Sequence, residues 1–199
     1  MKSLFKQIFL AISAIRLLPS AAIFALASKE GVIKADICRW HQINHQFTLS
    51  GFPRSIYYFL YLMTYVREYR NVFYLRLGWR ARFISWLCPP IATLEIDALS
   101  IGPGLFVQHG VASLISAETI GANFWVNQQV SIGYSNAEDR PTMGDNVTVR
   151  PGAKIIGKIR IGDNATVGLN TVVVSDVPDG ATVFGVPAKI IWRGPPPAF

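Results

Sequence analysis

The sequence contains little cysteine, and its second half contains almost no histidine. The only two cysteines, Cys38 and Cys88, are too few for a disulfide framework and have no CxxC spacing, so we expect a reducing compartment. His109 is the single histidine of residues 91–199. Metal sites that take several histidines from this half of the chain are therefore excluded.

Negative charge is scarce in the first half of the chain. Residues 1–90 contain 12 Lys/Arg and 3 Asp/Glu, whereas residues 91–199 contain 7 and 9, which gives net charges of +9 and −2. A basic, aromatic region of this kind favours contact with an anionic membrane surface over nucleic acid, so we expect peripheral membrane contact and no nucleic-acid partner.

The longest apolar run, residues 8–27, is interrupted by Arg16 and Pro19. An arginine at the centre of a spanning helix costs about 3 kcal/mol, which argues against both a cleaved signal and a plain transmembrane helix. The run predicts a helix that lies on or dips into a membrane, and a spanning helix stays the alternative.

Residues 1–90 are expected to form a helical, basic and aromatic region that packs on itself or contacts a membrane. Gly51 to Pro53 separates two helical stretches, and "CPP" at 88–90 ends the series. His41 and His45 stand four residues apart on a predicted helix. With no acidic or sulfur ligand beside them, they are interpreted as a solvated helix face and not as a metal site.

A period of six residues begins after Pro90, with an aliphatic residue at every repeat. The positions are Leu114, Ile120, Val126, Ile132, Met143, Val149, Ile155, Ile161, Val167 and Val173. A short strand followed by a tight corner has this period, and three such units close a triangular coil. Asn and Gly supply the corners because they adopt positive φ cheaply, as at Asn123, Asn146 and Asn164.

The period predicts a mainly β fold, a parallel β-helix of hexapeptide repeats over residues 91–191, followed by a tail at 192–199. Counting six residues per face puts Val107, Val126, Met143 and Ile161 on one face and Leu114, Ile132, Val149 and Val167 on the next. Two irregular steps interrupt the count.

The first irregular step is the seven residues from Val107 to Leu114, which predicts a bulge that turns His109 outward from the filled interior. The second is the 11 residues from Ile132 to Met143, where a projecting loop is expected to replace the strand of the third face.

These repeats resemble the left-handed β-helix acyltransferases, most closely the serine acetyltransferase branch. The resemblance rests on "GPGLFVQHGVASLIS", "VNQQVSIGY", "DRPTMGDNV", "PGAKIIGKIRIGDNATVGLNTVV" and "DVPDGATVFGVPAKII", and it covers about residues 93–191. It implies an acetyl-CoA-dependent O-acetyltransferase, assembled as a homotrimer with sites between subunits and without a metal.

In this family the histidine of the matching motif is the general base, so the resemblance implies that role for His109. An imidazole can take the proton of a hydroxyl as the oxygen attacks a thioester. The family also has a carboxylate in the preceding coil that orients the imidazole. Glu95 matches that position if one residue is deleted, and Asp97 is the competing candidate.

For the donor, the resemblance implies a groove whose ligands are backbone amides at corners one coil apart. The corresponding corner residues are Pro151 and Leu169, and Pro151 has no N–H to donate. The expected cofactor-binding residues are therefore Gly168, Leu169, Gly185, Pro187 and Lys189. Tyr134 and Arg140, in the projecting loop, are the expected acceptor-side residues.

One departure from the serine acetyltransferase pattern affects the acceptor. That branch has a second histidine in the loop, as D-R-H-P, whereas this loop reads "EDRPT" around Arg140. The short loop resembles the bacterial branch that O-acetylates capsule or exopolysaccharide sugars. The expected acceptor is therefore a saccharide hydroxyl of a polysaccharide precursor, lipid-linked or free, modified in the cytoplasm at the inner face of the plasma membrane. The alternatives are a serine O-acetyltransferase of cysteine biosynthesis and a non-catalytic β-helix scaffold.

Overall fold

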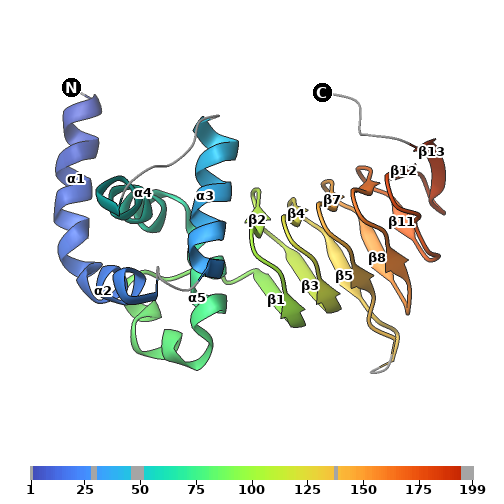
Figure 1. Ribbon diagram of the computed structural model, residues 1–199, viewed down its shortest axis with the longest axis horizontal. Coiled ribbons are helices and arrows are strands. Elements are labelled where there is room, and N and C mark those ends of the chain that lie inside the picture. The colour runs from blue at the N-terminus through green and yellow to red at the C-terminus, as the bar shows by residue number, and fades with distance from the viewer. Residues whose placement is uncertain (1, 28–30, 46–51, 137–138, 194–199) are drawn as a thin grey trace. The chain divides into compact units, whose positions relative to one another are not determined.

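The protein is described here by a computed structural model, which covers residues 2–27, 31–45, 52–136 and 139–193 (Figure 1). The chain divides into two compact units, Met1–Ile91 and Ala92–Phe199. Each unit has its own buried core.

The first unit is helical. Its elements are α1 (Lys2–Arg16), α2 (Leu18–Ala27), α3 (Gly31–His45), α4 (Phe52–Tyr65), α5 (Arg67–Leu77) and two 3-10 helices, η1 (Gly78–Phe83) and η2 (Ser85–Leu87). Aromatic rings fill its core. Phe24 of α2 stacks on Phe59 of α4 with centroids 4.3 Å apart, and Phe73 of α5 meets Phe59 edge-on at 4.9 Å. Most aromatic side chains of α4 and α5 therefore pack inside this unit.

The apolar run of residues 8–27 forms two helices, which corrects the expectation of one. The chain bends by 75° between Ile8–Arg16 and Leu18–Leu26, because Leu17 turns into the core and Pro19 lies in the first turn of α2. Among the described residues, no single helix is long and apolar enough to cross a bilayer. This bent pair passes the test of length and composition only when both helices are counted together.

Polar contacts tie the helices together. Asp36 of α3 forms an ion pair with Arg76 of α5 at 2.8 Å, and both side chains are almost fully buried. Arg70 donates hydrogen bonds to the carbonyls of Met63 and Thr64, where α4 ends. His41 is buried edge-on against a tyrosine ring 4.7 Å away, so the expectation that it lies on a solvated helix face is wrong.

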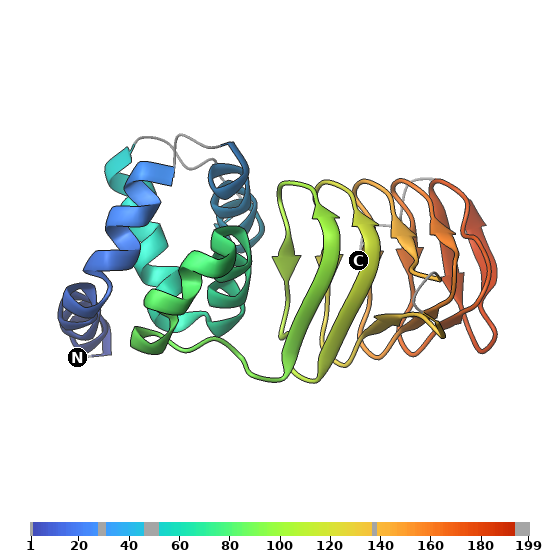
Figure 2. The ribbon, with the colours of Figure 1, turned by 90° about the horizontal axis from the view of Figure 1, so that it is seen from below.

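The second unit is a parallel β-solenoid, which confirms the expected β-helix fold with helices before it. Its strands are β1 (Leu94–Ile101), β2 (Phe106–Val107), β3 (Ser113–Ile120), β4 (Trp125–Val126), β5 (Ser131–Gly133), β6 (Thr142–Met143), β7 (Thr148–Val149), β8 (Lys154–Ile156), β9 (Arg160–Ile161), β10 (Thr166–Val167), β11 (Val172–Val173), β12 (Ala181–Phe184) and β13 (Lys189–Arg193). Figure 2 shows the successive coils stacked beside one another. At the end of the stack, β13 pairs antiparallel with β12, so Trp192 and Arg193 belong to this unit. The rest of the tail expected at 192–199 lies outside the described residues.

Three columns of aliphatic side chains fill the prism, one from each face. The first contains Ile101, Ile120, Met143, Ile161 and Val177; the second Val107, Val126, Val149, Val167 and Val183; and the third Ile115, Ile132, Ile155 and Val173. Nearly all of these side chains are fully buried. Each such side chain contributes about 1.5–3 kcal/mol of hydrophobic stabilisation, so the columns account for the regular strand period.

The structure corrects the predicted register at two points. Ile115, and not Leu114, lies in the column beside Ile132, because the corner before it holds two extra residues; the step from Val107 is therefore eight residues and not seven. Leu114 points outward and is 44% exposed. The six-residue spacing from Leu114 to Ile120 is a coincidence of a long strand, β3, that bends around an edge of the prism.

The second correction concerns the projecting loop. It is inserted at the edge between β5 and β6, and no face loses its strand, since Thr142 and Met143 pair directly with Thr119 and Ile120. The face assignment made across this loop is therefore wrong. Val149 pairs with Val126, while Met143 belongs to a different face.

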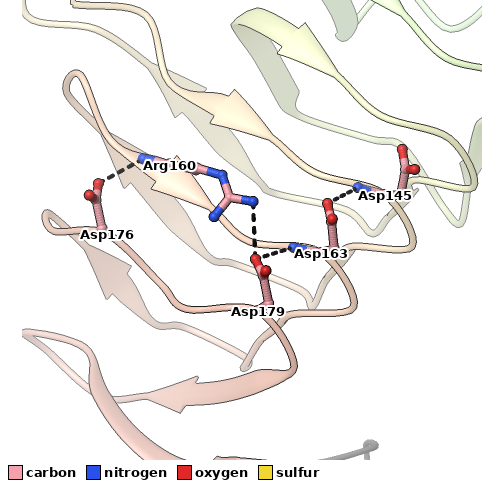
Figure 3. A network of polar contacts seen from close by, with 5 residues as sticks. All are labelled: Asp145, Arg160, Asp163, Asp176 and Asp179. Atoms are coloured by element: carbon pink, nitrogen blue, oxygen red, sulfur yellow. Dashed lines mark hydrogen bonds and ion pairs between the residues drawn. The ribbon is translucent and has the colours of Figure 1, made fainter.

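Side chains bridge the corners from coil to coil along one edge, and Figure 3 shows the aspartates among them. Asp163 accepts the backbone N–H of Asp145 at 2.8 Å, and Asp179 accepts that of Asp163 at 3.0 Å. Asn123, Asn146 and Asn164, all at positive φ, form a parallel ladder of amide hydrogen bonds. These contacts satisfy polar groups of the corners, which explains the recurring Asp-Asn pairs of the repeat.

Candidate active site

His109 lies at the widened corner between β2 and β3, and its side chain is exposed. Its backbone has φ 58°, and Ala112 in the same corner has φ 54°, so two residues that are not glycine adopt the left-handed backbone conformation there. Histidine, like Asn and Asp, adopts this conformation more often than most residues, whereas it is uncommon for alanine, so Ala112 marks the local constraint of this corner. The outward direction of the histidine, expected from the bulge, is confirmed.

The corner is fixed from both neighbouring coils. The N–H of Ala112 donates to Thr93 Oγ1 at 3.3 Å, and the N–H of Gln129 in the next coil donates to the Val111 carbonyl at 2.9 Å. Gly110 is required because a Cβ atom there would lie 2.7 Å from Val107 Cγ1. The imidazole is therefore presented from a rigid backbone, which suits a group that has to meet a reacting atom at a set distance.

The two carboxylates proposed as partners of His109 have different surroundings. Glu95 and Asp97 are exposed on β1, opposite Leu114 and Ser116 of β3. Asp97 forms an ion pair with Arg140 at 3.1 Å. Glu95 has no such partner among the described residues. No hydrogen bond joins either carboxylate to His109 within the described part of the chain.

The loop residues lie at another edge of the prism. Arg140 sits just before β6, with its guanidinium carbon 5.0 Å from the centre of the Tyr134 ring. Burial lowers the pKa of Arg140, but hydrogen bonding and charge attraction from Asp97, together with Tyr134, outweigh it and raise the pKa above its ordinary value. Its Nη1 atom is buried and makes no hydrogen bond with the described residues. Within one chain, therefore, Arg140 and Tyr134 are separated from His109 by a face of the solenoid.

Arg140 also borders a hollow of about 410 Å³. The lining residues carry charges of both signs: Glu118, Arg140, Thr142, Lys158, Ile159, Arg160 and Asp176. Figure 3 shows the two contacts of Arg160 there: its guanidinium forms an ion pair with Asp179, and its backbone N–H donates a hydrogen bond to Asp176.

Most of the residues expected to hold the donor share the edge of His109. Pro151 and Leu169 occupy stacked corners one coil apart, linked by the N–H of Asn170, which donates to the Pro151 carbonyl at 2.9 Å. Leu169 is exposed, and its own N–H has no partner among the described residues. Gly185 forms the next corner of this edge, with φ 100°.

The other donor-side residues fit less uniformly. Gly168 donates its N–H to the Val183 carbonyl at 2.8 Å, and a Cβ at this position would lie 2.3 Å from the Phe184 ring. Its glycine is thus explained by packing, and its amide is already used. Pro187 follows a cis peptide bond, and Lys189 is exposed on β13 beside Phe184.

Sequence reasoning missed the supports of the corner, Thr93 and Gly110, and the ion pair between Asp97 and Arg140. The position of Gly110 directly after His109 was a local signal for that glycine, whereas nothing local in the sequence points to Thr93. No group of three or more His, Cys, Asp or Glu side chains close enough to hold a metal occurs among the described residues.

Curated proteins similar to this chain include serine acetyltransferases, and no family model matches. The chain is 38% identical to the serine acetyltransferase of Helicobacter pylori over 118 residues, which are 57% of this chain and 69% of that protein. It is 34% identical to that of Synechococcus elongatus over 117 residues, 56% of this chain and 48% of the relative. It is 38% identical to the serine acetyltransferase of Staphylococcus aureus over 116 residues, which are 56% of this chain and 54% of that protein. The match thus spans about half the length of two of these three relatives.

Solved structures of serine acetyltransferases are also similar to this chain. The serine acetyltransferase of Neisseria gonorrhoeae in complex with serine has a TM-score of 0.64 and 28% identity, and the match covers 87% of this chain and 72% of that one. The serine acetyltransferase of Brucella abortus in complex with coenzyme A has a TM-score of 0.63 and 22% identity, with 85% and 70% covered, and shows the common fold alone.

These comparisons correct the expected acceptor. The relatives and structural neighbours named above are serine acetyltransferases, and none of them acts on a polysaccharide by name. The short loop and the missing second histidine pointed to the capsule branch, and that interpretation is wrong. The broader expectation of an acetyl-CoA-dependent O-acetyltransferase agrees with these relatives.

Proposed function

Because the chain belongs to the serine acetyltransferase family, we propose that it transfers the acetyl group of acetyl-CoA to the hydroxyl of L-serine. The observation that carries this proposal is the shared edge of the solenoid. An exposed imidazole, His109, stands at one corner, and the backbone amide of Leu169, which has no hydrogen-bond partner in the described part of the chain, stands three coils further along. At about 4.8 Å per coil, these two corners are roughly 14 Å apart, a span that suits an extended thioester arm.

In the proposed reaction His109 is the general base. Its imidazole takes the proton of the serine hydroxyl as the oxygen attacks the thioester carbon. The carbon–sulfur bond then breaks, and the imidazolium returns the proton to the leaving thiolate. A positioned base of this kind contributes about 10²–10⁴-fold to the rate. The rigid corner formed with Gly110 and Thr93 supports this role, because it fixes the direction of the side chain.

Glu95 is the better candidate for the carboxylate that steadies the imidazolium. Asp97 is engaged with Arg140 at 3.1 Å, and a carboxylate already paired has less attraction left for a second cation. Glu95 lies on the strand that Thr93 leads into, and Thr93 touches the His109 corner. Glu95 is proposed to act through His109 as a positioning residue.

The donor is proposed to lie along the edge formed by the corners of Leu169 and Gly185. The Leu169 amide would donate a hydrogen bond to it, and the neighbouring Pro187 and Lys189 would border its path. Lys189 is exposed and can meet a phosphate oxygen. Gly168 contributes by letting Phe184 pack against the coil and not by its amide.

The acceptor carboxylate is proposed to bind Arg140. A guanidinium presents a planar fork that matches a carboxylate, and the Arg140 side chain, in the inserted loop, is 20% exposed. Because Arg140 and His109 lie at different edges of one prism, they can share a substrate only if one chain supplies the base and a second chain supplies the loop. This separation supports a homotrimer with sites between subunits.

The test is thiol release from acetyl-CoA by the purified chain, with L-serine as acceptor and its mass increase as product readout. We expect turnover with L-serine and a loss of at least about a hundredfold in kcat for His109→Asn, with an unchanged oligomeric mass in light scattering. Full activity of His109→Asn would overturn the catalytic role. Binding of acetyl-CoA by calorimetry without turnover of L-serine would overturn the acceptor.

A further inference from the structure

The helical unit exposes a cluster of aromatic and arginine side chains, here called the aromatic–arginine patch: Trp79, Arg80, Arg82, Phe83 and Trp86. All five lie in η1 and η2. The three aromatic side chains are between 67% and 72% exposed, although residues of this size usually contribute to a core. An exposed apolar cluster of this kind marks an interaction surface.

The patch is held in place by the residues between its members. Ala81 and Ile84 are buried and fasten η1 to the unit. Trp79 packs edge-on against Phe83 with centroids 6.0 Å apart, and Trp86 donates its indole N–H to the Phe83 carbonyl at 3.2 Å. The Trp86 indole therefore already has its hydrogen bond before it leaves water, which removes the main penalty for entering an apolar phase.

The charges of the patch are available to an external partner. Arg80 lies over the Trp79 ring at 5.9 Å, and neither Arg80 nor Arg82 forms an ion pair with a described residue. Residues 1–90 contain 12 Lys/Arg and 3 Asp/Glu, and one of those three, Asp36, is buried against Arg76. The partner that suits this unit is therefore anionic.

We propose that the aromatic–arginine patch docks the protein on the surface of an anionic lipid bilayer. Tryptophan and phenylalanine rings belong at the boundary of headgroups and acyl chains, and arginines beside them meet lipid phosphates. A second apolar surface of the same unit fits this partner: Ile8, Phe9, Ile12, Ile15 and Leu18 of the α1–α2 bend are between 43% and 70% exposed. An amphipathic helix with such a stripe lies in the interface and does not cross it.

The experiment is flotation of the full chain with vesicles of phosphatidylcholine containing 0 or 30% phosphatidylglycerol, read as an apparent partition coefficient. We expect binding that needs the anionic lipid and weakens with salt. Trp79→Ser with Trp86→Ser should lower the partition coefficient about tenfold or more, and Arg80→Gln with Arg82→Gln about fivefold for each charge removed. Leu99→Ser is the matched control, because Leu99 is an equally exposed apolar residue of the solenoid and should leave binding unchanged.

Three results would overturn the proposal. The first is no binding of the wild-type chain to anionic vesicles, and the second is binding of the two patch variants as strong as that of the wild type. The third is a loss of binding in Leu99→Ser as well. A change of oligomeric mass in either patch variant without lipid would assign the patch to a contact between copies, and would also overturn it. Thermal unfolding of each variant checks that it is folded. The vesicle measurement needs neither acetyl-CoA nor serine, so its failure is distinguishable from failure of the proposed function.

Discussion

Asp97 of β1 and Arg140 of the inserted loop form an ion pair of 3.1 Å, which joins the first coil of the solenoid to the loop. The same guanidinium also lies over the ring of Tyr134, 5.0 Å from its centre. The loop arginine is thus oriented by two side chains before any substrate arrives. Preorganisation of this kind lowers the cost of binding a carboxylate.

The first prediction follows from that arrangement. Arg140→Gln should raise KM for L-serine about tenfold or more, with KM for acetyl-CoA nearly unchanged, because a charge-assisted bond to the acceptor is lost. Asp97→Asn should have a smaller effect in the same direction, since the arginine remains but is less well oriented. Steady-state kinetics with each substrate varied in turn checks both. A rise in KM for acetyl-CoA alone would contradict the assignment of Arg140 to the acceptor.

The second prediction uses the stacked corners at Pro151 and Leu169. Proline is tolerated at the first of these corners, so Leu169→Pro should remove one amide donor with little distortion. We expect KM for acetyl-CoA to rise about two- to tenfold, the value of one hydrogen bond. Pro151→Ala, which adds a donor at the equivalent corner, is the matched variant and should leave that KM unchanged or lower it. If Leu169→Pro binds acetyl-CoA as the wild type does, the donor does not use this amide.

The third prediction tests the corrected register. Ile115→Ala should lower the free energy of unfolding by about 2–5 kcal/mol, because the side chain is fully buried in a column and its loss leaves a cavity. Leu114→Ala, one residue away and exposed, should change it by no more than about 0.5 kcal/mol. Denaturant titration of the two variants in parallel gives both values. Equal effects would contradict the register described here.

Much of the solenoid was predictable because its period is a local property of the chain. The interior residues follow one another at six-residue steps from Ile120 to Ile132, and again from Met143 to Val173, since each corner within these two runs has the standard length. The count failed at the His109 corner and across the loop at 133–141, where a corner of non-standard length changes the face of every residue that follows. Pairing partners, and not spacing, decide the register at such points.

The candidate site was less predictable than the fold. His109 was identified because its motif resembles that of a family, and its exposure then agreed with a bulged corner. The ion pair between Asp97 and Arg140 joins residues 43 positions apart in the sequence, and only the folded position of the inserted loop brings them together. The acceptor was misjudged because one missing histidine was given more weight than the overall similarity of the coils.

The final prediction concerns the helical unit, where Asp36 and Arg76 form an ion pair of 2.8 Å with side chains 2% and 10% exposed. Asp36→Ala should lower the free energy of unfolding by about 3–5 kcal/mol, because the guanidinium is left buried without its counter-charge. Arg160→Ala, which breaks the exposed pair between Arg160 and Asp179, is the control and should cost about 1 kcal/mol or less. Thermal and denaturant unfolding compare the two. A small effect of Asp36→Ala would mean that water reaches Arg76 more freely than its burial implies, and the tie between α3 and α5 would then be packing of apolar side chains alone.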